Sequence, residues 1–180
     1  MRSIILCVLI AAVFIGPNVA RGSDSLSVND ATSSAEVANN FSYMIEGILS
    51  YSRWPDGITP SKACVVGSGT YKGLLFNNEA ISHEWGYYDD VGSLSPDRCD
   101  ILYIGVIDRE SYTLLLSKFI GLPVLTISEN DPECDAGSLI CLNMDESRIR
   151  FRVNLDAVAR SGIRIHPQVL KLGRELEAAR

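Results

Sequence analysis

The chain has 180 residues, of which 47% are hydrophobic and 21% are charged, and these ordinary globular values argue against a disordered protein. The formal net charge of −6 at pH 7 leaves no basic footprint for nucleic acid, so its partners are expected to be proteins or small molecules. A length of this order predicts one compact domain once a terminal processing segment is set aside.

The first 22 residues have the features of a signal peptide for export. Arg2 supplies a positive charge, an apolar run follows over residues 4–15, and Ala20-Arg21-Gly22 offers small residues for cleavage. The run is shorter than the roughly 20 residues that a bilayer core requires, which disfavours the alternative of an uncleaved anchor. We therefore expect residues 1–22 to be removed, with cleavage near Ala20 to Gly22.

The segment 23–33 is small and polar and is expected to form a flexible leader. A helix is then predicted to begin at Ser33 or Ser34, because these hydroxyls can cap it and apolar residues recur at helical spacing as far as Tyr51. Trp54-Pro55 should stop this helix, because proline disfavours helical geometry in the residue before it.

The middle of the chain alternates short apolar strands with helices. In chain order we expect strand 63–66, a glycine-rich turn at 67–69, a short helix over 71–75, an extended segment within 79–90, strand 100–106, a helix from Asp108 to Phe119 and strand 123–128. Continuous apolar strands of this kind are buried on both faces of a sheet. The pattern predicts an α/β sandwich with a mostly parallel sheet.

The C-terminal third predicts an antiparallel hairpin with arms over 138–144 and 148–154. In the second arm three arginines alternate with apolar residues, so that one face is basic and the other apolar. Two helices should follow, the first capped by Asn154 and ended by Gly162, the second starting at Pro167. Together residues 34–180 are expected to form a single domain.

Four cysteines lie beyond the expected signal peptide, at positions 64, 99, 134 and 141. An even number in an exported chain predicts two disulfides, for which three pairings are possible. Local spacing favours Cys134–Cys141, which would leave Cys64–Cys99. The absence of a C-x-x-C motif argues against thioredoxin-type chemistry and against a zinc ribbon. A structural role is the simpler interpretation of the short loop, and a redox-responsive role is the alternative.

Enzyme and cofactor motifs fit the sequence poorly. Gly67 and Gly69 lack the third glycine of a dinucleotide fingerprint, and neither a phosphate-binding lysine motif nor a G-x-S-x-G elbow is present. His83 and His166, the two histidines, have no second ligand at metal spacing. We therefore expect no catalytic residue, no cofactor and no metal.

Two groups of residues are candidates for binding. Arg53, Arg164 and His166 lie at the ends of predicted elements, where they could bind an anion, although ordinary capping and surface charge would explain them as well. On the hairpin, the apolar side chains and the arginines predict a protein-binding surface, with anchors expected to govern affinity and arginines to govern association rate. Its expected members are Ile140, Leu142, Arg150, Arg152 and Val158.

Several long motifs resemble the YfiR family. They are GILSYSRWP at 47–55, ACVVG at 63–67, CDILYIG at 99–105, ENDPECDAGSLICLN at 129–143 and RFRVNLDAVARSGIRIHPQVLKLGRE at 150–175. The resemblance implies a periplasmic, dimeric protein with a Rossmann-like or flavodoxin-like α/β fold and no catalytic activity. Segment 76–98 does not align with it.

The same resemblance implies a function. The best-known members of the family repress an inner-membrane diguanylate cyclase of the YfiN type, and an outer-membrane lipoprotein of the YfiB type relieves this repression. Cyclic di-GMP, exopolysaccharide and biofilm are thereby controlled. It also implies the pairs Cys64–Cys99 and Cys134–Cys141, and a ligand pocket at Arg53, Arg164 and His166. The alternative is a periplasmic small-ligand or redox sensor that acts on another membrane receptor.

Overall fold

The computed structural model describes residues 28–69, 71–77, 81–129, 131–145 and 148–178. The expected signal peptide, residues 1–22, lies outside them, as does the start of the expected leader. The first helix, α1, spans Val28–Tyr51. The expectation that it begins at Ser33 or Ser34 is therefore wrong, because residues 28–33 of the expected leader are already helical.

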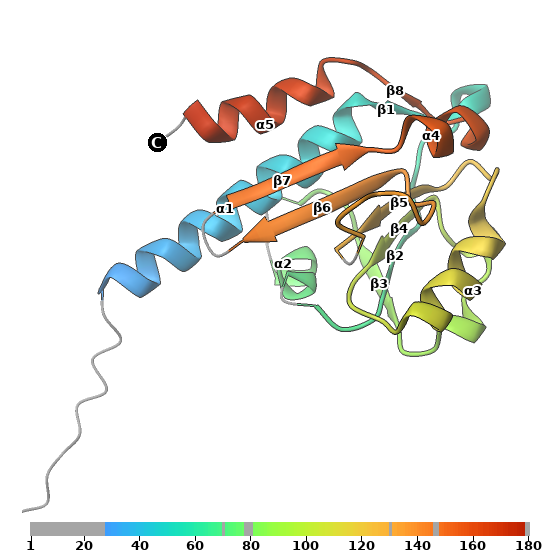
Figure 1. Ribbon diagram of the computed structural model, residues 1–180, viewed down its shortest axis with the longest axis horizontal. Coiled ribbons are helices and arrows are strands. Elements are labelled where there is room, and N and C mark those ends of the chain that lie inside the picture. Colours follow the sequence, from blue (N-terminus) through green and yellow to red (C-terminus); the bar gives the residue numbers. More distant parts are fainter. Residues whose placement is uncertain (1–27, 70, 78–80, 130, 146–147, 179–180) are drawn as a thin grey trace, which may run out of the picture.

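A six-stranded sheet forms the centre of the domain, in the order β3-β2-β4-β5-β6-β7 (Figure 1). The first five strands in this order pair in parallel, and β7 pairs antiparallel with β6. The strands are β2 (Ala63–Val66), β3 (Trp85–Tyr88), β4 (Ile101–Ile104), β5 (Leu125–Ser128), β6 (Ile140–Asp145) and β7 (Arg148–Val153). The prediction of a mostly parallel α/β sheet with a C-terminal antiparallel hairpin is confirmed.

Helices cover both faces of the sheet. On one face lie α1 and α5 (Val169–Ala178), and their apolar side chains pack on alternate strand residues such as Val65, Ile101 and Ile140. On the other face lies α3 (Arg109–Phe119), which packs on Val66, Leu102 and their neighbours. The central strands β2 and β4 are thus buried on both faces, which explains why their residues, ACVV and ILYI, carry no charged or strongly polar side chain.

The ends of the helices follow the local signals. Asp108 begins α3, with its carboxylate accepting a hydrogen bond from the Ser111 amide at 2.9 Å. Asn154 begins α4 (Leu155–Ser161), and its side-chain oxygen accepts a hydrogen bond from the Ala157 amide at 2.9 Å. This helix ends at Gly162, which has the left-handed conformation with φ 78°. A short helix α2 (Lys72–Asn77) and three single 3₁₀ turns (Pro55–Gly57, Val91–Ser93 and Pro96–Arg98) complete the connections.

A second, two-stranded sheet was not expected from the sequence. It joins β1 (Ser52–Arg53) to β8 (Arg164–Ile165) in antiparallel pairing. The amide of His166 also donates to the carbonyl of Tyr51 at 2.9 Å. The end of α1 and the start of the last helical segment, more than 100 residues apart in sequence, are thereby held side by side.

Candidate functional site

The carboxyl ends of β2 and β4 are the place where an open α/β sheet usually binds a ligand, because the chain leaves these neighbouring strands in opposite directions. Here the two following loops are joined to each other. The Ser68 amide donates to the Val106 carbonyl at 3.1 Å, and the Gly105 amide donates to Val66 at 2.9 Å. A Cβ on Gly105 would lie 2.2 Å from the Ser68 carbonyl oxygen. Backbone therefore occupies the place where a nucleotide would enter.

A polar pair lies at the same edge of the sheet, with Tyr103 buried and Glu129 half-buried. The Tyr103 hydroxyl, on β4, donates to the carboxylate of Glu129, which follows β5. Burial raises the pKa of the Glu129 carboxyl, against the opposing hydrogen bonds from Tyr103 and the Tyr71 amide and the nearby charge of Lys72. Burial is the main cause that raises the pKa of Tyr103 well above its usual value, and the negative charge of Glu129 is the second cause.

The raised pKa of Glu129 predicts how stability depends on pH. The folded state binds this proton more tightly than the unfolded state, so the stabilisation is complete below the unfolded pKa and is lost as pH rises through the folded pKa. Glu129→Gln keeps an oxygen that accepts from Tyr103 but has no charge to bury. We expect it to raise the urea midpoint at pH 7 and to leave it little changed at pH 4.

The exposed Glu84 supplies the matched control for this measurement. Glu84→Gln should leave the urea midpoint unchanged at both pH values. A Glu129→Gln protein that is equally destabilised at pH 4 and pH 7 would contradict the assignment.

The predicted residues Arg53, Arg164 and His166 are brought together by the two-stranded sheet. They line one open pocket of about 460 Å³, together with Tyr51 and Pro167. Arg53 and Arg164 are direct partners across β1 and β8, so their positive charges lie on neighbouring strands. The ring of Tyr51 stacks on that of His166, with centroids 6.2 Å apart. The pocket combines two guanidinium groups with aromatic surface.

Local roles account for part of this arrangement. The Arg53 guanidinium donates to the carbonyls of Ser50 at 2.6 Å and Ser52 at 2.7 Å, so it caps the C-terminal end of α1. The His166 Nδ1 accepts from the Gln168 amide at 3.2 Å. Arg164 is exposed, and within the part of the chain that the structure describes its guanidinium makes no comparable hydrogen bond. Capping therefore explains Arg53 but not the position of Arg164.

The four cysteines form two disulfides. Cys64, on β2, is bonded to Cys99, which precedes β4, and Cys134 is bonded to Cys141 on β6. These are the pairs that spacing favoured and that the family resemblance implied. The long bridge joins two neighbouring strand regions of the sheet, and the short one holds the segment 131–138 against the hairpin.

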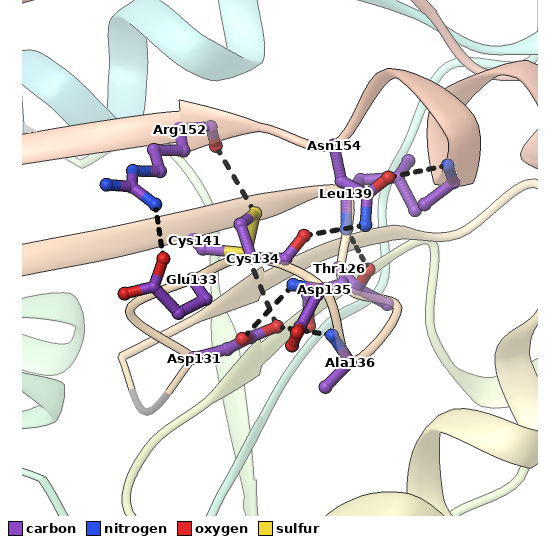
Figure 2. The surroundings of a disulfide bond; sticks show 12 residues. Thr126, Asp131, Glu133, Cys134, Asp135, Ala136, Leu139, Cys141, Arg152 and Asn154 are labelled. Atoms are coloured by element: carbon purple, nitrogen blue, oxygen red, sulfur yellow. Dashed lines mark hydrogen bonds and ion pairs between the residues drawn. A yellow bond between two sulfur atoms is a disulfide. The ribbon is translucent and has the colours of Figure 1, made fainter.

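The segment 131–138 is organised by one buried carboxylate (Figure 2). Asp131 is 5% exposed and accepts hydrogen bonds from the amides of Asp135 at 3.3 Å and Ala136 at 3.1 Å. Its Oδ2 lies 3.7 Å from Cys141 Sγ. At the same time Asn154 donates to the Cys134 carbonyl at 2.9 Å, which ties the segment to the start of α4.

The prediction of a binding surface on the hairpin is wrong for its apolar residues, Ile140, Leu142 and Val158. Ile140 is 0% and Leu142 is 1% exposed, because α1 and α5 cover this face of β6. Cys141, on the opposite face, is also buried, since the segment 131–138 packs over it. Val158 is half-buried against the same core. None of these three apolar residues offers an anchor to a partner.

The arginines are placed as expected, on the face of the hairpin that carries Cys141. Arg152 is paired with Cys141 across the strands, and Arg150 is paired with the exposed Asn143. Arg152 also forms an ion pair with Glu133 at 3.2 Å, and both side chains are more than half exposed. A partner can therefore reach this basic face.

Leu155, which the sequence analysis missed, is 75% exposed and lies two residues after the end of β7. It is the first residue of α4, whose buried residues are Ala157 and Ser161. Apolar residues that are this exposed are candidates for contact with a partner. The buried Asp131 was also missed, because nothing in the sequence separates it from the surface acids around it.

Two further properties concern the described residues. No group of three His, Cys, Asp or Glu side chains there is arranged to hold a metal ion. Within the same residues, no helix combines the length and apolarity that crossing a bilayer requires. A disulfide-linked α/β domain with a closed switch point, a basic pocket and a basic hairpin face has the features of a binding protein.

A comparison with protein families identifies the kind of binding protein. The family model described as YfiR/HmsC-like matches residues 41–174. The chain therefore belongs to the YfiR/HmsC-like family, as its motifs indicated. Proteins of this family are periplasmic and regulatory rather than catalytic, and they act in diguanylate cyclase signalling.

Proposed function

We propose that this protein is exported to the periplasm, binds the periplasmic domain of a YfiN-type inner-membrane diguanylate cyclase and represses it. Repression lowers cyclic di-GMP and so limits exopolysaccharide and biofilm formation. The observation that carries the proposal is the family match over residues 41–174. A homodimer, and release of repression by a YfiB-type outer-membrane lipoprotein, belong to the same proposal.

The contact surface in this proposal combines Arg150 and Arg152 with Leu155. The arginines supply a basic face on an otherwise acidic chain, which suits an acidic partner surface. Leu155 replaces the buried Ile140 and Leu142 as the apolar anchor, because it is exposed and lies three residues after Arg152. Apolar anchors of this kind carry most of the affinity of an interface.

The test is a gene deletion complemented with variants. We expect deletion to raise cellular cyclic di-GMP when a functional cyclase is present, and the wild-type gene to restore the low level. Leu155→Asp should fail to restore it, because a charge replaces an exposed anchor without disturbing the core. Arg150→Glu should restore it only partly, since the basic face mainly affects the association rate.

Leu170→Asp is the matched control, since Leu170 is 57% exposed on α5, away from the hairpin arginines in sequence. It should complement as well as wild type, at equal abundance and with an unchanged circular dichroism spectrum. Unchanged cyclic di-GMP in the deletion strain would reject repression. Full complementation by Leu155→Asp would reject the proposed contact surface but not the proposed repression.

The pocket favours a second candidate function, a sensor of a small organic anion. Two guanidinium groups would hold an anionic group, and the rings of Tyr51 and His166 would pack against an apolar body. With phenylacetate as the probe, we expect Arg164→Ala to weaken binding about 10-fold or more, because a charge-assisted hydrogen bond is lost.

Isothermal titration calorimetry measures this binding directly. The control is Arg160→Ala, because Arg160 forms an ion pair with Asp156 on α4 and does not line the pocket. It should bind the probe as wild type does. Equal affinities for wild type and Arg164→Ala, or no heat with the wild type, would remove this candidate.

A further inference from the structure

The two disulfides differ in how a thiol can reach them. Cys64 and Cys99 are 1% and 2% exposed, and both lie in the sheet region. In the short bridge Cys141 is also buried, whereas Cys134 is 9% exposed, the most of the four. A thiolate must approach the sulfur it attacks. Access therefore favours the short bridge, and within it the Cys134 sulfur.

The buried sulfur of the short bridge has a carboxylate as its neighbour. Asp131 lies below the bridge in the view of Figure 2. Its Oδ2 atom is 3.7 Å from Cys141 Sγ. The amides of Asp135 and Ala136 hold this carboxylate in place, and the Tyr112 hydroxyl lies 3.4 Å from Oδ2. A negative charge held this close in a water-poor site disfavours a second negative charge on the sulfur.

We propose that Asp131 controls thiol–disulfide exchange at the Cys134–Cys141 bridge, by confining attack to Cys134, slowing the departure of Cys141 and disfavouring anionic thiols. An external thiolate forms a bond to Cys134 Sγ, the Cys134–Cys141 bond breaks, and Cys141 leaves as a thiolate that takes up a proton. A second thiolate then attacks the mixed disulfide and releases Cys134. In total, two thiols are oxidised to one disulfide and the bridge is reduced to two thiols.

The other charges near the bridge leave Asp131 as the main contributor. Glu133 is paired with Arg152, so these two charges offset each other. Asp135 and Arg109 are exposed to solvent on the rim of a pocket of about 380 Å³ that Asp131 also lines. Exposed charges are screened by salt, whereas a buried charge is screened much less.

The first experiment uses the wild-type protein and three small thiols that differ in charge: cysteamine, 2-mercaptoethanol and 2-mercaptoethanesulfonate. Rates are compared at equal thiolate concentration, each relative to the rate of the same thiol with a small uncharged disulfide, because nucleophilicity also varies with thiol pKa. Acid quenching and mass spectrometry measure them. We expect the cationic thiol to react fastest and the anionic thiol slowest, and the trapped mixed disulfide to lie on Cys134. Equal rates for the three thiols, or a mixed disulfide on Cys141, would overturn the proposal.

The second experiment compares Asp131→Asn with Asp135→Asn. Removal of the buried charge should speed reduction by 2-mercaptoethanol about 10-fold, because a better leaving thiolate departs faster. It should also shrink the rate ratio between cationic and anionic thiols, which a merely looser loop would not do. Asp135→Asn should change both quantities less than about two-fold, since that charge is screened by solvent.

The role of Asp131 would be refuted if Asp131→Asn were reduced at the wild-type rate and showed the wild-type rate ratio between cationic and anionic thiols. If this variant does not fold, the wild-type charge series and the position of the mixed disulfide decide the question alone. These measurements need no cyclase, so their outcome is independent of the proposed repression.

Discussion

Ile140→Asp is expected to abolish folding of the domain. Ile140 is completely buried on β6, where it packs between the neighbouring strands and the helices of the α1 face. The substitution removes a core side chain and leaves a carboxylate without a partner, each of which costs several kcal/mol. The sum approaches the whole stability of an ordinary domain, about 5–15 kcal/mol. Circular dichroism and limited proteolysis of the purified variant measure the result.

Ile140→Val serves as the control, because it removes one methylene and keeps the shape. It should remain folded and lose about 0.5–1.5 kcal/mol in urea denaturation. A cooperatively folded Ile140→Asp protein would show that this position is reachable by solvent, as the sequence alone had indicated. The expected unfolding also means that lost repression by this variant would say nothing about a binding surface.

Removal of the long disulfide is expected to destabilise the protein more than removal of the short one. The bridges close loops with sequence separations of 35 for Cys64–Cys99 and 7 for Cys134–Cys141. If a disulfide acts by restricting the unfolded chain, these lengths correspond to about 4 and about 2 kcal/mol. Alanine is the replacement of choice at both bridges, because it buries no unpaired hydroxyl.

The two double variants, Cys64→Ala/Cys99→Ala and Cys134→Ala/Cys141→Ala, act as controls for each other. Urea denaturation without reductant gives the two free energies of unfolding. Equal losses, or a larger loss for the short bridge, would show that contacts made by the segment 131–138 outweigh chain entropy. The hydrogen bonds of Asp131 are the first contacts to examine in that case.

Local physics determined much of the fold from the sequence. Apolar runs such as ILYI at 101–104 are typical of strands buried on both faces, and the helical spacing before Tyr51 predicted the helix there. Asp108, Asn154 and Gly162 mark helix ends because their side chain, or the lack of one, meets a backbone requirement within a few residues. The family motifs added the cysteine pairing and the residues of the pocket.

Long-range packing decided the rest. Strand alternation gives Ile140 and Cys141 opposite faces, but whether the second face is open depends on the segment 131–138, which folds over it. The pairing of Arg53 with Arg164 joins two-residue strands from opposite ends of the domain, too short to produce a periodic signal. The burial of Asp131 and the exposure of Leu155 depend on which neighbours surround them in space, and a single sequence records only neighbours along the chain.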